Sequence, residues 1–298
     1  MDRSKLSDTQ IGRFFILSSS SALKHPLVKR RLYAFLASLF CFAVFFTPLN
    51  AELYYIVTKE LNTALIEEEI HRLVNEERKN RKIAPLQYDK KMAEIALMHS
   101  RNMSEKNFIS HRDTAGLYPQ GRVLKFYPEI IGGVGENIAY MNGDDEKIVA
   151  ADFVRRWMNS PGHRANILNT DYNITGIGIK QKGEYFYGTQ KFIEAIAKVP
   201  ADAVSEFMYG SESALKFEFA GSFKKEDITV FCDFADGSIR HYLKDGRYYT
   251  GMAPLMPQWI DDKSFTLTFK FDKGRGIYKF RFGKNGSTYS DGFNVTVK

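Results

Sequence analysis

The chain has 298 residues, 44% hydrophobic and 14% aromatic, which is enough for about two domains with substantial cores. Its formal net charge of +7 is unevenly distributed, because residues 1–51 hold seven Lys/Arg against two Asp/Glu and so contribute +5. The basic balance is therefore an N-terminal feature, and it gives no indication of a nucleic-acid partner.

The N-terminal segment has the layout of an export signal. KHPLVKRR (24–31) precedes LYAFLASLFCFAVFFTPLNA (32–51), 20 residues without a charge, as in a secretory signal or a transmembrane anchor. Pro48 and Ala51 suit cleavage after Ala51, whereas the length suits retention in a membrane, and both remain open. Residues 1–51 are thus expected to be a cytoplasmic basic leader plus a signal peptide or membrane anchor. Residues 52–298 are expected to lie outside the cytoplasm, secreted or membrane-anchored.

Two amphipathic helices are predicted between residues 61 and 103, after a linker at 52–65. ALIEEEIHRLVNEERKNR has apolar residues at helical spacing, and the second helix follows Asp89, a suitable N-cap. One stripe of this second helix contains Met92, Ala96, His99 and Met103. His71 and His99 are expected to be packing residues of these helices.

The next part of the chain alternates loops with regular elements. Residues 107–135 are predicted to be loop-rich because of their glycines and prolines. DDEKIVAADFVRRWM (144–158) predicts a third amphipathic helix with an acidic start, as the helix dipole favours. Residues 174–193 alternate around a Lys-Gly turn and predict a β-hairpin.

After Pro200 the pattern changes to short alternating runs separated by Gly, Asp and Asn. In one of them Phe265, Leu267, Phe269 and Phe271 fall on the same side. Strands at this spacing predict an all-β, immunoglobulin-like sandwich over residues 207–298. The only cysteines are Cys41 and Cys232, so the exported part is expected to contain no disulfide.

Three polar residues lie beside glycine-rich turns. NFISHRDTAG contains His111, GVGENIAY contains Glu136, and RRWMNSPGHRANILN places His163 after an Asn-Ser-Pro-Gly turn. Two histidines and one glutamate beside such backbone could share a polar cleft. Each of them could equally be an ordinary loop side chain, and the residues alone leave this open.

Four motifs, FISHRDTAG, GENIA, WMNSPGHRANIL and GIGI…YFYGTQKF, occur in the order and spacing of the CAP superfamily. This superfamily contains cysteine-rich secretory, antigen 5 and pathogenesis-related proteins with an SCP-like domain. Over roughly residues 66–194 the chain resembles its disulfide-free microbial branch. The resemblance implies an α-β-α sandwich over residues 66–199, and hence an α+β fold overall, with a broad open cleft.

In many eukaryotic members that cleft holds two His and two Glu, sometimes around a divalent metal. The resemblance places His111, Glu136 and His163 at three of these positions, with Asn137, Trp157 and Asn166 as supporting residues. The fourth residue of the set, a Glu just after the helix tryptophan, is missing, since Met158, Asn159 and Ser160 follow Trp157 here.

Three roles remain open for these residues. They could orient loops or a ligand, they could bind Zn²⁺ through two imidazoles and one carboxylate, or they could catalyse hydrolysis. The missing second carboxylate leaves no obvious general base, which argues against hydrolysis. HExxH, P-loop, GxSxG and CxxC motifs are also absent from the sequence.

The sequence therefore predicts an extracytoplasmic CAP-domain protein that binds a lipid, glycan or peptide of the cell envelope, and not nucleic acid. If residues 32–51 are not cleaved, they also bind the membrane. A metal-dependent hydrolase acting on envelope polymer or peptide, and a structural surface or adhesion protein, are the alternatives. The sequence establishes no cofactor, and Zn²⁺ bound by His111, Glu136 and His163 is the one candidate.

Overall fold

The computed structural model describes residues 60–200 and 202–298. The predicted leader, the predicted signal peptide or anchor at 32–51, and most of the predicted linker lie outside the described residues. Among the helices that are described, none combines the length and the apolar character needed to cross a membrane.

The two predicted N-terminal helices are present as α3 (Thr63–Lys79) and α4 (Lys90–Lys106). The side chain of Asn62 accepts a hydrogen bond from the backbone N–H of Ala64, and Asp89 accepts one from Met92, so Asp89 is the N-cap that the sequence predicts. Asn107 ends α4 in the left-handed conformation, at φ 54°.

The loop-rich interpretation of residues 107–135 is wrong in part. This stretch contains α5 (Pro119–Phe126) and the start of β2 (Ile130–Asn142). Pro119 suits the first turn of a helix, where its missing N–H is not needed. Gly132 lies inside β2, where a Cβ would come within 1.9 Å of the Glu194 carbonyl oxygen. This position therefore needs glycine because the backbone of β4 lies so close to it, and the glycine does not mark a loop.

The third predicted helix is α6 (Glu146–Asn159), and Asp145 caps it by accepting from two backbone N–H groups. The sequence suggests that Pro161 and Gly162 end this helix in a tight turn. Instead, Ser160 is an extended junction, and Pro161 begins the next helix, α7 (Pro161–Ile167). His163 therefore lies in the first turn of α7.

The central strands are β1 (Gln87–Tyr88), β3 (Ile174–Lys182) and β4 (Tyr185–Lys198), together with β2. β3 and β4 form the predicted hairpin, β2 pairs with β4 in antiparallel orientation, and β1 pairs with β3 in parallel. Because β4 is longer than β3, it continues beyond the hairpin and pairs with β6 (Glu212–Phe219).

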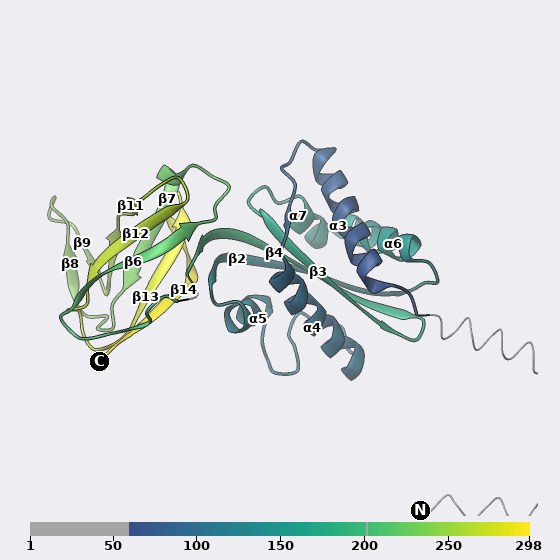
Figure 1. The fold of residues 1–298 in the computed structure, drawn as a ribbon, viewed down its shortest axis with the longest axis horizontal. Helices are drawn as coiled ribbons and strands as arrows, with labels where there is room; N and C mark the ends of the chain where they lie inside the picture. The colour runs from purple at the N-terminus through teal and green to yellow at the C-terminus, as the bar shows by residue number, and fades with distance from the viewer. Residues whose placement is uncertain (1–59, 201) are drawn as a thin grey trace, which may run out of the picture. The chain divides into compact units, whose positions relative to one another are not determined.

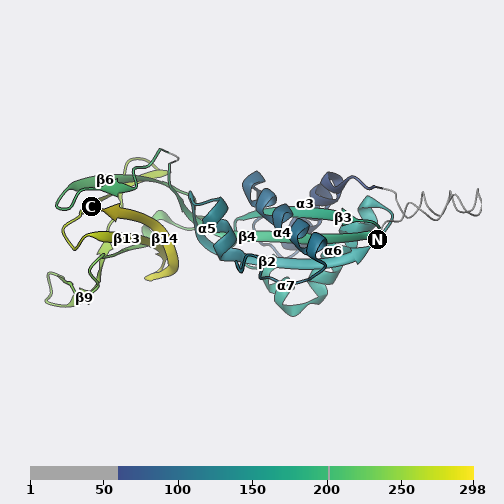
Figure 2. The same cartoon turned by 90° about the horizontal axis from the view of Figure 1, so that it is seen from below.

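Helices cover both faces of these strands. α3, α6 and α7 lie on one face and α4 and α5 on the other, as Figure 1 shows and Figure 2 shows from the α4 side. We call them the α3 face and the α4 face. Side chains alternate between the faces, so Ile177 and Ile179 enter the core under α3 and α6, whereas Gly176 and Gly178 adjoin the backbone of α4.

Gly178→Ala is expected to destabilise the fold. A Cβ at this position would lie 2.0 Å from the backbone nitrogen of Leu97, and the backbone of α4 cannot move away without repacking its whole buried stripe. We expect a loss of roughly 1–3 kcal/mol in the free energy of unfolding, measured by urea denaturation. The control is Gly162→Ala, where a Cβ would meet nothing within 4 Å. Equal stability of the two variants would contradict the close approach of α4 to β3.

The C-terminal region is all-β, as the sequence predicts, and the described residues together are α+β. The seven-stranded sheet continues from β4 through β6 to β12 (Ser264–Lys270) and β11 (Gln258–Trp259). A five-stranded sheet has the order β10 (Met252–Leu255), β7 (Ile228–Asp233), β13 (Gly276–Lys284), β14 (Ser287–Val297), β5 (Glu206–Phe207). A two-stranded hairpin, β8 (Arg240–Tyr242) with β9 (Tyr248–Thr250), and the 3₁₀ helix η3 (Lys225–Asp227) complete it.

The core of this region contains the phenylalanine stripe of β12, with Phe265 and Phe271 fully buried. Cys232 is buried there as a free thiol. The same hydrophobic cluster includes Ile196 and Val199 at the end of β4. The division into domains 66–199 and 207–298 stays a prediction, and a cut between them would expose these apolar side chains.

Candidate functional site

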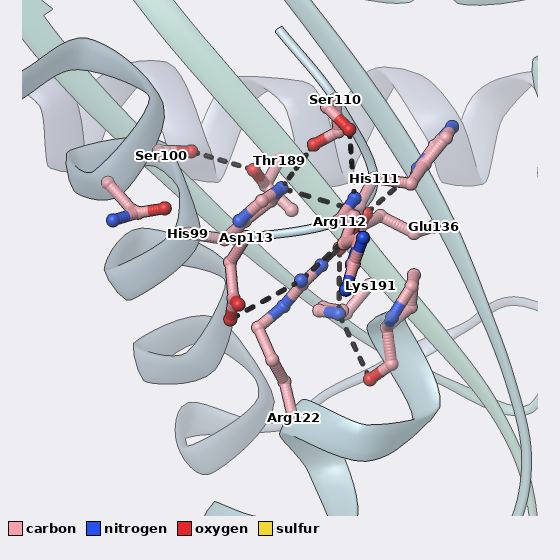
Figure 3. Close-up of polar contacts among 12 residues, drawn as sticks. His99, Ser100, Ser110, His111, Arg112, Asp113, Arg122, Glu136, Thr189 and Lys191 are labelled. Atoms are coloured by element: carbon pink, nitrogen blue, oxygen red, sulfur yellow. Dashed lines mark hydrogen bonds and ion pairs between the residues drawn. The ribbon is translucent and has the colours of Figure 1, made fainter. Parts of the chain in front are cut away.

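Glu136 lies in the middle of β2, and its carboxylate is buried on the α4 face within a group of charged side chains (Figure 3). Nδ1 of His111 lies 2.9 Å from Oε1 of Glu136. Nη2 of Arg122 donates to Oε2 at 2.6 Å, and Nζ of Lys191 lies 2.7 Å from the same oxygen. Both carboxylate oxygens are therefore engaged by basic side chains of the chain itself.

The two cationic residues, Lys191 and Arg122, come from different elements. Lys191 lies on β4 directly opposite Glu136 in the strand register. Arg122 comes from α5, and its Nη1 donates to the carbonyl oxygens of His111 and Leu117 at 2.9 and 2.8 Å. The guanidinium thus ties the His111 loop to α5 while it neutralises Glu136. Both Lys191 and Arg122 are buried.

His99 of α4 is buried beside this group, as the packing interpretation predicts. Its Nε2 lies 2.9 Å from the carbonyl oxygen of Ser110 and 3.9 Å from Oε1 of Glu136. Burial lowers the pKa of His99 to about 4, although Glu136 opposes the shift. The imidazole is therefore neutral at pH 7, with Nε2–H donating to Ser110.

The environment shifts the pKa of two more members of this group. Burial alone would raise the pKa of Glu136, but the hydrogen bond from His111 and the charges of Lys191 and Arg122 outweigh it and lower that pKa to about 2. Burial lowers the pKa of Lys191 to about 8, although Glu136 partly compensates. At pH 7 Glu136 is thus a carboxylate that faces a buried ammonium and a guanidinium.

His163 reaches this group through its backbone. Its carbonyl oxygen accepts from Nδ2 of Asn137 at 3.1 Å, and Nδ2 of Asn166 donates to Oδ1 of Asn137 at 2.9 Å and to the carbonyl oxygen of Glu136 at 3.2 Å. The two asparagines thus fasten α7 to β2. Trp157 on α6 is fully buried in the hydrophobic core, as expected for a packing residue.

The side chain of His163 lies near that of His111. Burial lowers the pKa of His163, and the charge of His111 adds to the shift. No described hydrogen bond or ion pair joins the His163 ring to Glu136. The structure therefore brings His111 and Glu136 into contact, whereas His163 is a near neighbour whose position depends on Asn137 and Asn166.

The residues present do not suit a metal ion. In residues 60–200 and 202–298, no group of three or more His, Cys, Asp or Glu has an arrangement that could hold one. The carboxylate that would bind Zn²⁺ already accepts from His111 and Arg122 and pairs with Lys191. A divalent cation would have to displace these partners and approach two buried positive charges.

Sequence reasoning did not identify Arg122 and Lys191 as members of the site. For Lys191 the sequence does carry a signal, because in a strand with period two it falls on the same side as Thr189 and Ile193. A lysine on the buried side of a strand needs a partner with negative charge. Arg122 has no comparable signal, since its neighbours in α5 are both polar and apolar.

Comparisons with known proteins agree with the resemblance. The model of the cysteine-rich secretory protein family, CAP, matches residues 71–192. YkwD of Bacillus subtilis, an uncharacterized protein, is 34% identical over 127 residues, which are 43% of this chain and 46% of that protein. YlbC of Bacillus subtilis, an uncharacterized membrane protein, is 35% identical over 128 residues, 43% of this chain and 34% of that protein. The match thus spans less than half the length of either relative.

Among solved structures, an extracellular protein with an SCP domain from Bacillus anthracis is 30% identical, with a TM-score of 0.37, covering 43% of this chain and 40% of that one. The family model matches residues 71–192, and this range contains the three predicted site residues and the charged group around Glu136. Residues 71–192 of this chain thus match the CAP domain of the cysteine-rich secretory protein family.

Proposed function

We propose that this chain is a binding protein of the cell envelope that recognises its ligand on the α4 face, beside His111. The observation that carries the proposal is the engagement of both Glu136 oxygens by His111, Arg122 and Lys191. A carboxylate with a pKa of about 2 and no free oxygen is a poor general base. This favours a rigid binding surface over a hydrolytic centre.

His111 is the member of the group that a ligand can reach, because its side chain is 46% exposed whereas that of Glu136 is 1% exposed. When the imidazole is neutral, the Glu136 carboxylate holds the proton on Nδ1, and Nε2 is then a hydrogen-bond acceptor. A hydroxyl or amide of the ligand can donate to this nitrogen. The buried charges keep the ring in one orientation, so little entropy is lost when the ligand binds.

The proposal extends to fold and location. Helices on both faces of β2–β4 support an α-β-α sandwich of the CAP type, and two sheets that enclose the phenylalanine core support an immunoglobulin-like sandwich after it. The basic and apolar segments at 24–51 support a protein that is secreted or membrane-anchored, with residues 52–298 outside the cytoplasm. The ligand is then a lipid, glycan or peptide of the envelope.

Binding to a cell wall tests the proposal. The full-length chain should sediment with sacculi prepared from Bacillus subtilis, and His111→Ala should lower the bound fraction. The lost hydrogen bond is worth about 0.5–1.5 kcal/mol, or roughly two- to tenfold in affinity. His163→Ala should have a smaller effect in the same direction.

The control is His241→Ala, a half-buried histidine on β8 of the C-terminal region. It should sediment like the wild type. If the wild type binds neither to sacculi nor to vesicles of Bacillus subtilis lipids, or if all three variants bind equally, the α4 face does not recognise the envelope and the proposed function is wrong.

A further inference from the structure

Three tyrosines lie together at the end of β2 and β4 that is far from the C-terminal region. Tyr140 on β2 is opposite Tyr187 on β4 in the strand register, with ring centroids 6.0 Å apart and ring planes within 24°. Tyr185, two residues before Tyr187 on β4, is also near Tyr140, with ring centroids 6.5 Å apart. Tyr140 is 50% exposed, Tyr185 is 44% exposed and Tyr187 is half-buried. We call these three residues the tyrosine shelf.

The tyrosine shelf is on the same face of the sheet as the charged group. Tyr140 follows Glu136 by four residues on β2, and Tyr187 precedes Lys191 by four on β4, without a register shift between them. Even spacings keep side chains on one face of a strand, and four residues span about 13 Å. The shelf and Glu136 are therefore about 13 Å apart on one face of the sheet, which is about the length of a short oligomer.

The shelf offers the chemistry that recognises a sugar. Exposed aromatic rings present apolar faces, while their hydroxyl groups stay in water, and no described hydrogen bond engages the hydroxyls of Tyr140, Tyr185 or Tyr187. Lys180 is opposite Tyr187, and Asn142 is opposite Tyr185. These two polar side chains border the rings and also have no described hydrogen-bond partner.

We propose that the tyrosine shelf binds an uncharged glycan strand made of N-acetylated pyranose rings, with His111 contacting the same strand further along. The C–H faces of the sugar rings stack on Tyr140 and Tyr187, and their hydroxyl and amide groups bond to Asn142, Lys180 and Nε2 of His111. This inference rests on the proposed function, because it names the ligand class of the same face.

Charge and shape favour a glycan over the other envelope ligands. Asp144, Asp145 and Glu146 follow β2 directly, and the carbonyl of Glu184 accepts from the N–H of Gly143. Together with Lys147, Lys180 and Lys182, these four acidic residues leave no net positive charge beside the shelf to attract a polyanion or an anionic lipid headgroup. An acyl chain needs an enclosed apolar cavity, whereas rings that are 44–50% exposed present an open surface.

Calorimetric titration of the full-length chain with chitohexaose, a linear hexamer of N-acetylglucosamine, tests the inference. Replacing Tyr140 and Tyr187 together by Ala should weaken binding about tenfold, since each aromatic contact is worth about 0.5–1.5 kcal/mol. Replacing both by Phe should restore most of the affinity, because stacking remains. Both variants should keep the wild-type melting temperature within a few degrees, because the two rings contribute little to the core.

The matched control is the second exposed tyrosine pair, Tyr242 and Tyr248 on the β8–β9 hairpin, 62% and 48% exposed with centroids 5.5 Å apart. Replacing this pair by Ala should leave chitohexaose binding unchanged. An equal loss would show a general affinity for exposed aromatic rings and would overturn the inference. Absence of chitohexaose binding by the wild type, or displacement of the bound sugar by phosphatidylglycerol vesicles, would also overturn it.

The two proposals fail in different ways. If the shelf variant still sediments with sacculi while His111→Ala does not, the shelf is not the glycan site and the proposed function stands. If the shelf variant loses chitohexaose and sacculi while His111→Ala retains both, the glycan assignment stands and the role of His111 is wrong.

Discussion

Glu136→Gln is expected to destabilise the protein by about 3–5 kcal/mol, because it removes the nearest counter-charge of two buried cations and leaves only the more distant Asp113, 3.7 Å from Arg122. Lys191 and Arg122 lie 2.7 and 2.6 Å from the carboxylate and are buried. A neutral amide of the same shape cannot balance either charge, and its NH₂ group would point a donor at other donors. Urea denaturation of the full-length chain at pH 7 measures the loss, and a normal free energy of unfolding would contradict the ionic arrangement.

Lys191→Met provides the comparison. It removes the ammonium but leaves Glu136 paired with Arg122 and His111, so no charge is left without a partner. We expect a smaller loss than for Glu136→Gln, and the double variant should lose less than the sum of the two. A coupling energy near zero in this double-mutant cycle would show that Glu136 and Lys191 do not interact.

The acid sensitivity of the protein should have the same origin. The folded-state pKa of Glu136 is lowered from 4.5 to about 2, so its stabilisation is fully present above pH 4.5 and is lost as the pH falls toward 2. The shift corresponds to roughly 3 kcal/mol. Glu136→Gln should remove this part of the pH dependence. If the free energy of unfolding of the variant still falls below pH 4.5 as steeply as that of the wild type, another group is responsible for the acid sensitivity.

Much of the fold could be predicted because it depends on local patterns. The apolar spacing and Asp89 predict α3 and α4, and the Lys-Gly turn predicts the β3–β4 hairpin. α5 was not predictable in this way, since it has only eight residues and a glycine in its first turn. The glycines of β2 resemble those of a loop in the sequence, and only the tertiary packing explains them: Gly132 lies against the β4 backbone, Gly133 against Tyr289 and Gly135 against Tyr172.

The candidate site could also be predicted only in part. The contact between His111 and Glu136 follows from the family motifs, which mark both residues. Arg122 and Lys191 join them from α5 and β4, and a charged residue in a sequence is ordinarily assigned to the solvent. Their burial becomes understandable only when the register places Lys191 opposite Glu136. A pairwise ionic requirement of this kind cannot be read from one segment alone.

Arg78 is a second buried charge that the sequence disguises, since NEERKNR reads as the solvent side of a helix. Its side chain is fully buried, and its guanidinium donates to carbonyl oxygens from three separate loops or helix ends. The bonds run to Ala84 at 2.7 Å, Ile167 and Asn169 at 2.8 Å each, and Tyr172 at 3.1 Å. Burial lowers the pKa of Arg78 to about 10, so it stays charged at pH 7.

Arg78→Met is therefore expected to cost roughly 3 kcal/mol or more, because four carbonyl oxygens lose their donor inside the protein. Arg78→Lys should recover only part of this, since one ammonium cannot reproduce the planar fork that reaches all four. The control is Arg81→Met, one turn further, where an exposed pair with Glu77 is worth at most about 1 kcal/mol. Because Ile167 ends α7, which carries His163 and Asn166, Arg78→Lys should also broaden the NMR signals of His163. Equal stability of Arg78→Met and Arg81→Met would mean that the carbonyls find other donors and that Arg78 does not hold α7 in place.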